Sequence, residues 1–511
     1  MVLDEIAKKF ARFVGRGCFS GLRGRDVLGA DAKIQDDFIF QARDALGKGT
    51  FGVVTLGVRR QTQFERAIKT VECKNPHVSD LVCNEVEVLR GVDHPNIVRF
   101  FFAYHEENQV HIVTEPCRGG ELFERTVDAS MFCEQDAAIV MQQAFAAVFY
   151  LQCRDIVHRD IKAENFLFLS DAPIEHNTLK LIDFGLATHL EPGAFLKEKV
   201  GTPAYMSPQV WKGEYDKTCD IWSLGVIAFV LLSGRFPFGG KSLEKLQKKI
   251  MVGRLEFRSE CWERVSEDAK SLICALLEKK PKSRISADGA LDHEWICLKT
   301  RSTTVRRNLD LSFVESLKAT RMQARLKQAI LRTIVAWVDV DEVFLELRMQ
   351  FAALDTNRDG VLTRAEIESG LAHLGLSEAD LESNLDAIMG GRFSRQIEYT
   401  EFLSAALVHG NFLTQNLAMK IFRCLDSDGN GVISREDLEH IYRRKLPMWT
   451  LRQPELPARK ATMNLLREAN LEGVELNFAQ FISWLGVVEG EASPASSACS
   501  AAAEQRTVQH C

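Results

Sequence analysis

The fold of this chain is decided by the stretch His158-Arg159-Asp160-Ile161-Lys162-Ala163-Glu164-Asn165, which Asp183-Phe184-Gly185 follows, its aspartate eighteen residues after the asparagine. A carboxylate followed by an amide and a second carboxylate can orient a hydroxyl group and hold magnesium beside phosphates. Taken singly, each residue is ordinary: a histidine packed in a core, or an aspartate in a turn. Their shared order and spacing favour a catalytic site, with Asp160 orienting the hydroxyl and Asn165 and Asp183 binding magnesium.

A glycine-rich segment lies upstream, over residues 46–54. Its glycines let main-chain amides approach phosphate oxygens where a side chain would block them. The same pattern can open a dinucleotide-binding fold, but a helix should then follow, whereas residues 53–58 alternate or are β-branched as in a strand. A phosphate-binding hairpin is therefore favoured, with nucleotide contacts expected at Leu46, Gly47, Gly49, Gly52 and Val54.

Lys69 follows Gly52 by seventeen residues in Ala67-Ile68-Lys69. That places its ammonium on the next strand, within reach of the α- and β-phosphates, although an ordinary surface lysine is the simpler alternative. Glu85, in an amphipathic run, is the predicted partner that holds the lysine in place, and Glu87 is the second candidate for that role.

Together these segments resemble the catalytic domain of protein kinases, with Ala163 where proline is common. The resemblance implies an α+β bilobal fold over residues 38–296, with ATP and Mg²⁺ as cofactors. It also implies that Lys162 is a catalytic residue of the serine/threonine type. By the same resemblance Thr114 and Glu115 border the adenine pocket, and Glu121 and Glu164 bind a basic residue of the substrate near the phosphorylated position.

The activation segment departs from the kinase pattern. Gln209 stands where a glutamate usually pairs with an arginine, here Arg284, and glutamine can still accept a neutral hydrogen bond from it. Between Thr188 and Thr202 there is no serine, threonine or tyrosine, so the usual phosphorylation site is missing. Glu191 and Glu198 are candidates to pair with Arg159 as a permanent substitute for phosphate, although loop glutamates are more often simply exposed to solvent.

Two twelve-residue segments, 355–366 and 426–437, have the spacing of EF-hand calcium loops. Oxygen ligands at positions 1, 3 and 5, a glycine at 6, a carbonyl at 7 and a carboxylate at 12 enclose calcium. The second loop ends in aspartate, which reaches less far than glutamate, so we expect weaker calcium binding or tolerance of magnesium there. The predicted ligands are Asp355, Asn357, Asp359, Val361 and Glu366 in the first loop, and Asp426, Asp428, Asn430, Val432 and Asp437 in the second.

EF-hands fold in pairs, and the partner of each calcium loop is degenerate. Residues 390–395 lack the carboxylates that begin a loop, and the fourth hand has Ala469 first and Gln480 last. We therefore expect two lobes, 343–410 and 411–488, each with one calcium-binding and one structural hand. Sensor sites of this type work at about 0.1 to 10 μM calcium.

The connector between the two parts, residues 297–342, is basic. Apolar residues recur there at helical spacing, which predicts an amphipathic helix of the kind that calcium-loaded EF-hand lobes bind. A helix packed permanently on a domain surface is the alternative. The apolar positions are Met322, Leu326, Ala329, Ile330, Ile334 and Trp337.

The order of catalytic domain, basic junction and four EF-hands resembles the calcium-dependent protein kinases of plants and protists over about residues 38–488. The resemblance implies an all-α, calmodulin-like calcium domain and a junction that obstructs the catalytic cleft until calcium binds. Two alternatives remain open: a calcium-sensing scaffold with an inactive kinase fold, which Gln209 favours, and an active kinase with a calcium buffer appended.

The composition of the chain narrows the possible class and location of the protein. The chain has 511 residues, a net charge of −6 and 13 scattered cysteines, which predicts several domains of a cytoplasmic protein with no nucleic-acid partner. The longest apolar stretch, residues 224–232, is too short to cross a bilayer. We expect a monomer. Residues 1–37 form an extension whose basic, apolar pattern allows weak peripheral membrane contact, and residues 489–511 are predicted to be a disordered tail.

Overall fold

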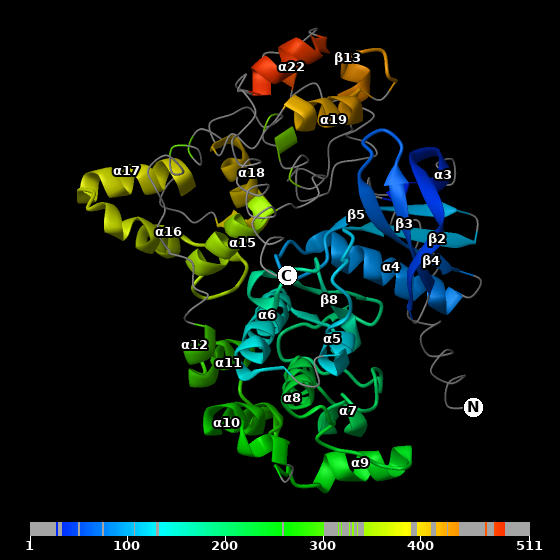
Figure 1. Cartoon of the computed structure of the whole chain (residues 1–511), viewed down its shortest axis with the longest axis vertical. Coiled ribbons are helices and arrows are strands. Elements are labelled where there is room, and N and C mark those ends of the chain that lie inside the picture. The colour runs from blue at the N-terminus through cyan, green and yellow to red at the C-terminus, as the bar shows by residue number, and fades with distance from the viewer. Residues whose placement is uncertain are drawn as a thin grey trace, which may run out of the picture.

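The fold has a β-sheet lobe, a helical lobe and a helical calcium-loop region (Figure 1). A computed structural model describes most of residues 27–485, and the predicted amphipathic segment at the N-terminus and the predicted tail lie outside the described residues. The described parts are 27–28, 33–300 without 50–51, 74–75, 107, 129–131 and 258–259, then 315, 318, 327, 330–331, 335, 342–389, 396–409, 415–438 without 427, 466–467 and 475–485.

The N-terminal lobe is a six-stranded sheet in the order β1-β5-β6-β4-β3-β2, with helix α4 (Pro76–Gly91) beside it. β2, β3 and β4 form an antiparallel meander, in which Val54 pairs with Lys69 and so sets the lysine against the glycine hairpin. The strands are β1 (Val27–Leu28), β2 (Phe38–Gly49), β3 (Gly52–Arg59), β4 (Glu65–Glu72), β5 (Phe100–Glu106) and β6 (Gln109–Thr114).

Strand β1, which was not predicted from the sequence, pairs in parallel with β5 at the edge of the sheet. The segment after it is tied to the same strand: the Ile34 amide donates to Glu106 at 3.0 Å, and the Tyr104 hydroxyl donates to Asp37 at 2.6 Å. Ile34 is buried on the sheet beside Phe38. The end of the N-terminal extension is therefore part of the first lobe.

The C-terminal lobe is built around two buried helices, α6 (Glu134–Cys153) and α8 (Thr218–Ser233). Nearly every residue of α8 is buried, as expected for a helix that is apolar on all sides. The other elements are α5 (Leu122–Asp128), β7 (Ile156–Val157), η1 (Ala163–Asn165), β8 (Phe166–Phe168), η2 (Ile174–His176), β9 (Leu179–Leu181), β10 (Thr188–His189), α7 (Pro208–Lys212), α9 (Leu243–Val252), η3 (Glu260–Glu263), α10 (Glu267–Leu276), η4 (Pro281–Ser283), α11 (Ala287–Leu291) and α12 (Glu294–Thr300). The predicted α+β bilobal fold followed by a helical EF-hand region is confirmed.

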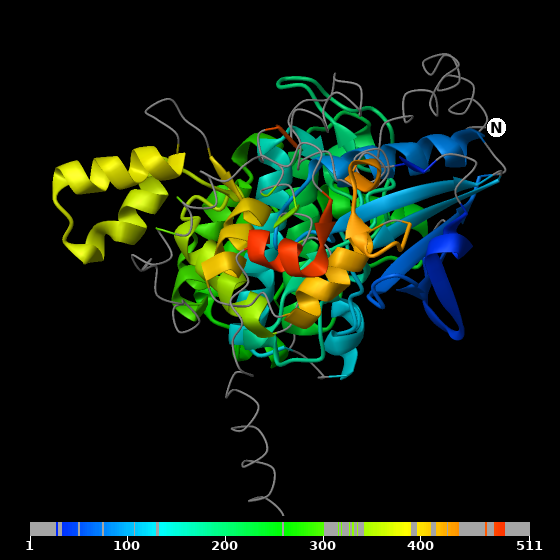
Figure 2. The same ribbon diagram turned by 90° about the horizontal axis from the view of Figure 1, so that it is seen from above.

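The calcium-loop region pairs its short strands two by two. Val361 lies opposite Glu398, and Val432 opposite Asn477, so each predicted calcium loop is joined to the degenerate loop that follows it. In Figure 2, α16 and α17 (yellow) project from the body of the molecule. The elements are α15 (Glu342–Leu354), β11 (Val361–Leu362), α16 (Arg364–Leu371), η6 (Ala372–Leu374), α17 (Glu378–Met389), β12 (Ile397–Glu398), α18 (Tyr399–His409), α19 (Gln415–Leu425), β13 (Val432–Ile433), β14 (Leu476–Asn477) and α22 (Phe478–Leu485).

Most of the junction lies outside the described residues, including five of the six predicted apolar positions, and Ile330 is the exception. Ile330, Leu331 and Val335 are helical and buried in the same hydrophobic core as the calcium-loop helices. The Lys327 ammonium lies 5.8 Å from the centroid of the Trp484 ring on α22. The described residues of this part of the junction, each in helical conformation, thus lie among the hands.

No helix among the described residues is both long enough and apolar enough to span a membrane.

Candidate functional site

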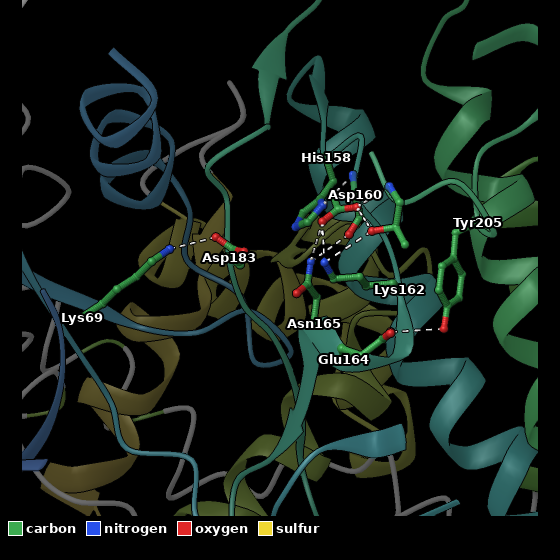
Figure 3. A network of polar contacts seen from close by, with 9 residues as sticks. Lys69, His158, Asp160, Lys162, Glu164, Asn165, Asp183 and Tyr205 are labelled. Carbon is green, nitrogen blue, oxygen red and sulfur yellow. Dashed lines mark hydrogen bonds and ion pairs between the residues drawn. The ribbon is translucent and has the colours of Figure 1, made fainter. Parts of the chain in front are cut away.

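The predicted ion pair between β4 and α4 is formed. The Lys69 ammonium lies 2.7 Å from the Glu85 carboxylate and 2.8 Å from the Asp183 carboxylate, and Figure 3 shows the lysine pointing toward Asp183. Burial alone would lower the pKa of Lys69, but the two carboxylates outweigh it and raise the pKa above its usual value. The lysine is therefore a fixed cation between two lobes, where phosphate oxygens would be bound.

The catalytic loop gathers its polar groups around Asp160. Lys162 Nζ lies 2.8 Å from one carboxylate oxygen, and the Thr202 amide and hydroxyl donate to the other at 2.9 and 2.7 Å. Asn165 donates to the Asp160 carbonyl at 2.8 Å (Figure 3). Thr202, whose part in this arrangement was not predicted from the sequence, helps to hold the carboxylate in one orientation.

Backbone strain positions both predicted carboxylates. Arg159 and Asp183 have φ angles of 68° and 61°, a conformation that non-glycine residues rarely adopt. The buried Asp220 of α8 accepts the amides of His158 and Arg159 at 2.8 and 3.0 Å, which fixes the turn before Asp160. Helix α8 therefore acts as the anchor of the catalytic loop.

The glycine hairpin is described except at residues 50–51. A Cβ on Gly52 would lie 2.1 Å from the Thr70 carbonyl oxygen, so this glycine is required by the close approach of β4. Gly47 has no atom within 4 Å of a Cβ position, and Leu46 is 45% exposed. Open space at the hairpin is what a nucleotide site needs, and Val54, paired with Lys69, lies at its base.

The segment after β6 that includes Glu115, called the hinge below, is fixed by contacts of the Glu115 side chain. The Glu115 carboxylate binds Lys180 Nζ at 2.7 Å and the Arg99 amide at 2.8 Å. Lys180 and the guanidinium groups of Arg99 and Arg348 overcome the effect of burial and lower the pKa of Glu115 to about 2, while burial with the two arginines lowers the pKa of Lys180 to about 8. Because its carboxylate is used here, Glu115 can meet a nucleotide only through its main chain. Thr114, the other predicted hinge residue, ends β6 opposite Ala67.

The predicted substrate acids lie close together, with a third that was not predicted from the sequence. Burial and the charges of Glu124 and Glu164 raise the pKa of Glu121, which shows that the three carboxylates share one field. The Tyr205 hydroxyl donates to Glu164 at 3.1 Å (Figure 3). Glu124 follows Glu121 by one turn at the start of α5, a spacing that could have indicated it.

In the activation segment, one of the two predicted acids pairs with Arg159. Arg159 Nη1 lies 2.7 Å from the Glu198 carboxylate, and the Tyr215 hydroxyl donates to the Glu198 carbonyl at 2.7 Å. The Arg159 side chain also donates to the Leu186 carbonyl, which ties the start of the segment to its end. Of the two predicted acids, Glu198 makes the pair, and the described ion pairs of Arg159 do not include Glu191.

Gln209 retains a bond to Arg284 across the helical lobe. The guanidinium donates to the Gln209 amide oxygen at 3.1 Å, and both side chains are buried. The Gln209 amide nitrogen donates in turn to the Thr218 hydroxyl at 3.2 Å. The neutral hydrogen bond expected from the sequence is therefore confirmed, and Gln209 is no argument for an inactive fold.

We predict that Gln209→Glu raises the melting temperature without abolishing activity. An ion pair with buried Arg284 replaces a hydrogen bond in which only the guanidinium is charged, a gain of about 1 kcal/mol, which corresponds to about 2 to 4 °C in a domain of this size. Thermal unfolding measures it, with Gln247→Glu on the surface of α9 as the control. An unchanged or lower melting temperature would reject the proposed gain.

The first calcium loop concentrates negative charge. Burial and the carboxylates of Asp359 and Glu366 raise the pKa of Asp355 to about 8. Among the described residues Asp355 Oδ1 is buried without a hydrogen-bond partner, while Oδ2 accepts the Gly360 amide at 2.9 Å. An unpartnered buried carboxylate oxygen among other carboxylates fits a divalent cation.

Other ligands of this loop are arranged by hydrogen bonds. Glu366 accepts the Asn357 amide at 3.1 Å and the Thr363 amide at 2.9 Å, and with Thr363 it forms a capping box at the start of α16. The Asn357 side chain contacts Asp359, and Val361 begins the β11 strand.

The second predicted loop brings its carboxylates together. Asp426, Asp428 and Asp437 each place an oxygen within 4.8 Å of the others, the one such group of metal-ligating side chains found in the described part of the chain. Asp437 also accepts the Ser434 amide at 2.8 Å, as Glu366 does with Thr363. Asn430 contacts Asp428, and Val432 begins β13. The shorter aspartate therefore still reaches the other two carboxylates.

Comparisons with known proteins agree with this geometry. Residues 40–296 match the protein kinase domain family, and residues 344–443 match the EF-hand domain pair. Calcium-dependent protein kinase 5 of Plasmodium falciparum (isolate 3D7) is 36% identical over 402 residues, which cover 78% of this chain and 69% of the relative. Calcium-dependent protein kinase 33 of Arabidopsis thaliana is 34% identical over 401 residues, 77% and 76% of the two chains.

A rice relative extends the match further along this chain. Calcium-dependent protein kinase 11 of Oryza sativa subsp. japonica is 32% identical over 447 residues, which cover 85% of this chain and 76% of the relative. The match thus includes both the catalytic lobes and the calcium loops. This chain belongs to the calcium-dependent protein kinase family.

Proposed function

We propose that the junction of this calcium-dependent serine/threonine protein kinase inhibits catalysis at low calcium and is withdrawn when the hands bind calcium. One observation carries the proposal: Ile330, Leu331 and Val335 are buried in the core that the calcium-loop helices form. Side chains that are buried among the hands cannot cover the catalytic cleft at the same time. This packing supports the proposal, because it is the arrangement expected of a released junction.

The geometry supports the predicted catalytic roles. Asp160 would accept the hydrogen bond of a substrate hydroxyl, with Lys162 2.8 Å away to neutralise developing charge. Asn165 and Asp183 would hold magnesium, which screens the phosphate charges when ATP is bound. Lys69 would hold the phosphates between the lobes.

The nucleotide would lie between the glycine hairpin and the hinge. Gly47 has room for phosphate oxygens, and the main chain of Glu115 is available to the base because its side chain is occupied behind the hinge. On the substrate side, Glu121 and Glu164 would bind a basic residue near the phosphorylated position. Glu124 adds a third carboxylate to that field.

Calcium would be held by the two predicted loops, 355–366 and 426–437, and the hands paired with them would be structural. The unpartnered Asp355 oxygen supports the first site and the convergence of Asp426 with Asp428 and Asp437 supports the second. Calcium can shift the junction only by binding one arrangement more tightly than the other. We place the enzyme in the cytoplasm as a monomer acting on protein substrates with basic residues near the phosphorylated position.

The proposal is tested by phosphorylation of a peptide with an arginine before its serine, in calcium and in chelator. We expect calcium to raise the rate about 5- to 150-fold, the ratio that corresponds to a typical coupling free energy between two sites. Trypsin cleavage within residues 297–342 should change over the same calcium range, since the junction is predicted to move. Equal rates and equal cleavage in calcium and chelator would instead favour an appended calcium buffer.

A further inference from the structure

The turn of the first calcium loop lies on the catalytic domain. Gly360, at loop position six, is buried with a φ angle of 79°, and a Cβ there would lie 2.3 Å from the Tyr150 ring and 2.9 Å from the His94 ring. The Tyr150 hydroxyl accepts the Asp93 amide at 2.6 Å, which fixes the ring. Helix α6 and the segment after α4 therefore form the surface against which the turn of this loop packs.

A cation of the catalytic domain stands at the same place. Arg154 follows α6, and its guanidinium lies 3.7 Å from the centroid of the Tyr150 ring. Its Nη1 donates to the Asp359 carbonyl, loop position five, at 3.4 Å. Arg154 thus places a positive charge beside a predicted calcium ligand.

The second calcium loop is open at the matching turn, as far as the described residues show. Gly431, its position six, is exposed, and nothing lies within 4 Å of a Cβ position there. Asp428 and Asn430 are exposed as well. At position six, therefore, the first loop lies against the catalytic domain, whereas the second loop is open within the described part of the chain.

We propose that Arg154 sets the calcium threshold of the first loop. Its charge neutralises part of the field of three carboxylates, Asp355, Asp359 and Glu366, that would otherwise attract the divalent cation. It is also a like charge close to the bound ion. Both effects lower the calcium affinity of the first loop. In the full chain this loop therefore needs a higher calcium concentration to bind the ion than it would need without the neighbouring arginine. The inference rests on calcium binding by this loop, as proposed above.

The test is calorimetric titration of the full chain with calcium, with a predicted calcium ligand of one loop substituted at a time. In an Asp426→Ala background, Arg154→Gln should tighten binding at the first loop about 3- to 10-fold, the size of a partly screened charge interaction. Arg154→Lys keeps the charge and should remain near the parent affinity. In a Glu366→Gln background, Arg154→Gln should leave the second loop unchanged.

A matched arginine controls for general effects of the substitution. Arg125 also stacks on an aromatic ring, Phe168 at 4.6 Å, and donates to main-chain carbonyls of residues 170 and 172. Arg125→Gln should not alter either affinity. Arg154→Met, which keeps the packing on Tyr150, replaces the glutamine variant if that one unfolds.

The outcomes separate the role of Arg154 from calcium binding itself. First-loop affinity that is unchanged or weaker in Arg154→Gln, or tightened equally in Arg154→Lys, would overturn the role of Arg154 while calcium binding stands. If Glu366→Gln alone removes no calcium binding from the protein, the proposed first site itself is wrong.

Discussion

Asp160→Asn is expected to lower the turnover number about 10²- to 10⁴-fold, the range for loss of a positioned general base. Asparagine has the same shape and can still accept a hydrogen bond from the Thr202 amide, now 2.9 Å from the carboxylate. It cannot accept the substrate proton, and Lys162 loses its ion pair. Steady-state peptide phosphorylation at saturating calcium and magnesium-ATP measures the loss.

Nucleotide affinity supplies the control for that result. Lys69 and Asp183 bind each other at 2.8 Å and do not depend on Asp160 for their position, so ATP should bind the variant about as well as the parent. Asp171→Asn, an exposed aspartate after β8, should leave turnover unchanged. A variant that keeps more than a tenth of the parent rate would show that Asp160 is not the group that accepts the proton.

Glu366→Gln is expected to move the calcium concentration for half-maximal activity upward by about tenfold or more, since sensor affinity depends on ligand charge. The substitution is structurally mild, because glutamine also serves in a capping box and can accept the Thr363 amide. The helix start of α16 is thus preserved while the charge of position twelve is lost. Peptide phosphorylation across a calcium buffer series gives the shift.

The second loop offers the parallel substitution, Asp437→Asn. Its side chain also accepts the amide three residues before it, at Ser434, so that contact can be retained. If both loops drive the junction, each variant shifts the curve and the double variant shifts it further. A calcium curve that is the same in parent and double variant would exclude these loops as the sensors.

The catalytic constellation could be predicted from sequence because the chemistry fixes it locally. Asp160, Lys162 and Asn165 lie within six residues, and their mutual distances follow from one turn of chain. The calcium ligands are local for the same reason, since twelve residues contain the whole loop. Lys69 and Glu85 are farther apart, yet one strand and one helix connect them, so their pairing could also be anticipated.

Contacts between the two parts of the chain could not be predicted. Asp93 accepts both the amide and the hydroxyl of Thr400 at the start of α18, across 307 positions of sequence. Asp93 belongs to no motif, and Thr400 lies in the predicted second hand but at no ligand position, so nothing in the sequence pairs the two residues. The pairing of β1 with β5 was missed for a related reason: two residues carry no periodicity.

The charged groups around the Glu115 and Lys180 pair determine whether the catalytic domain keeps its properties as a separate fragment. Arg348 of α15 donates to Thr178 at 3.4 Å, and Arg99 donates to the Val335 carbonyl at 2.7 Å, beside the Glu115 and Lys180 pair. A fragment ending at residue 296 would lose both partners and admit water to the Glu115 and Lys180 pair. Inhibitor screens run on such a fragment would thus rank compounds against a hinge with different electrostatics from that of the intact enzyme.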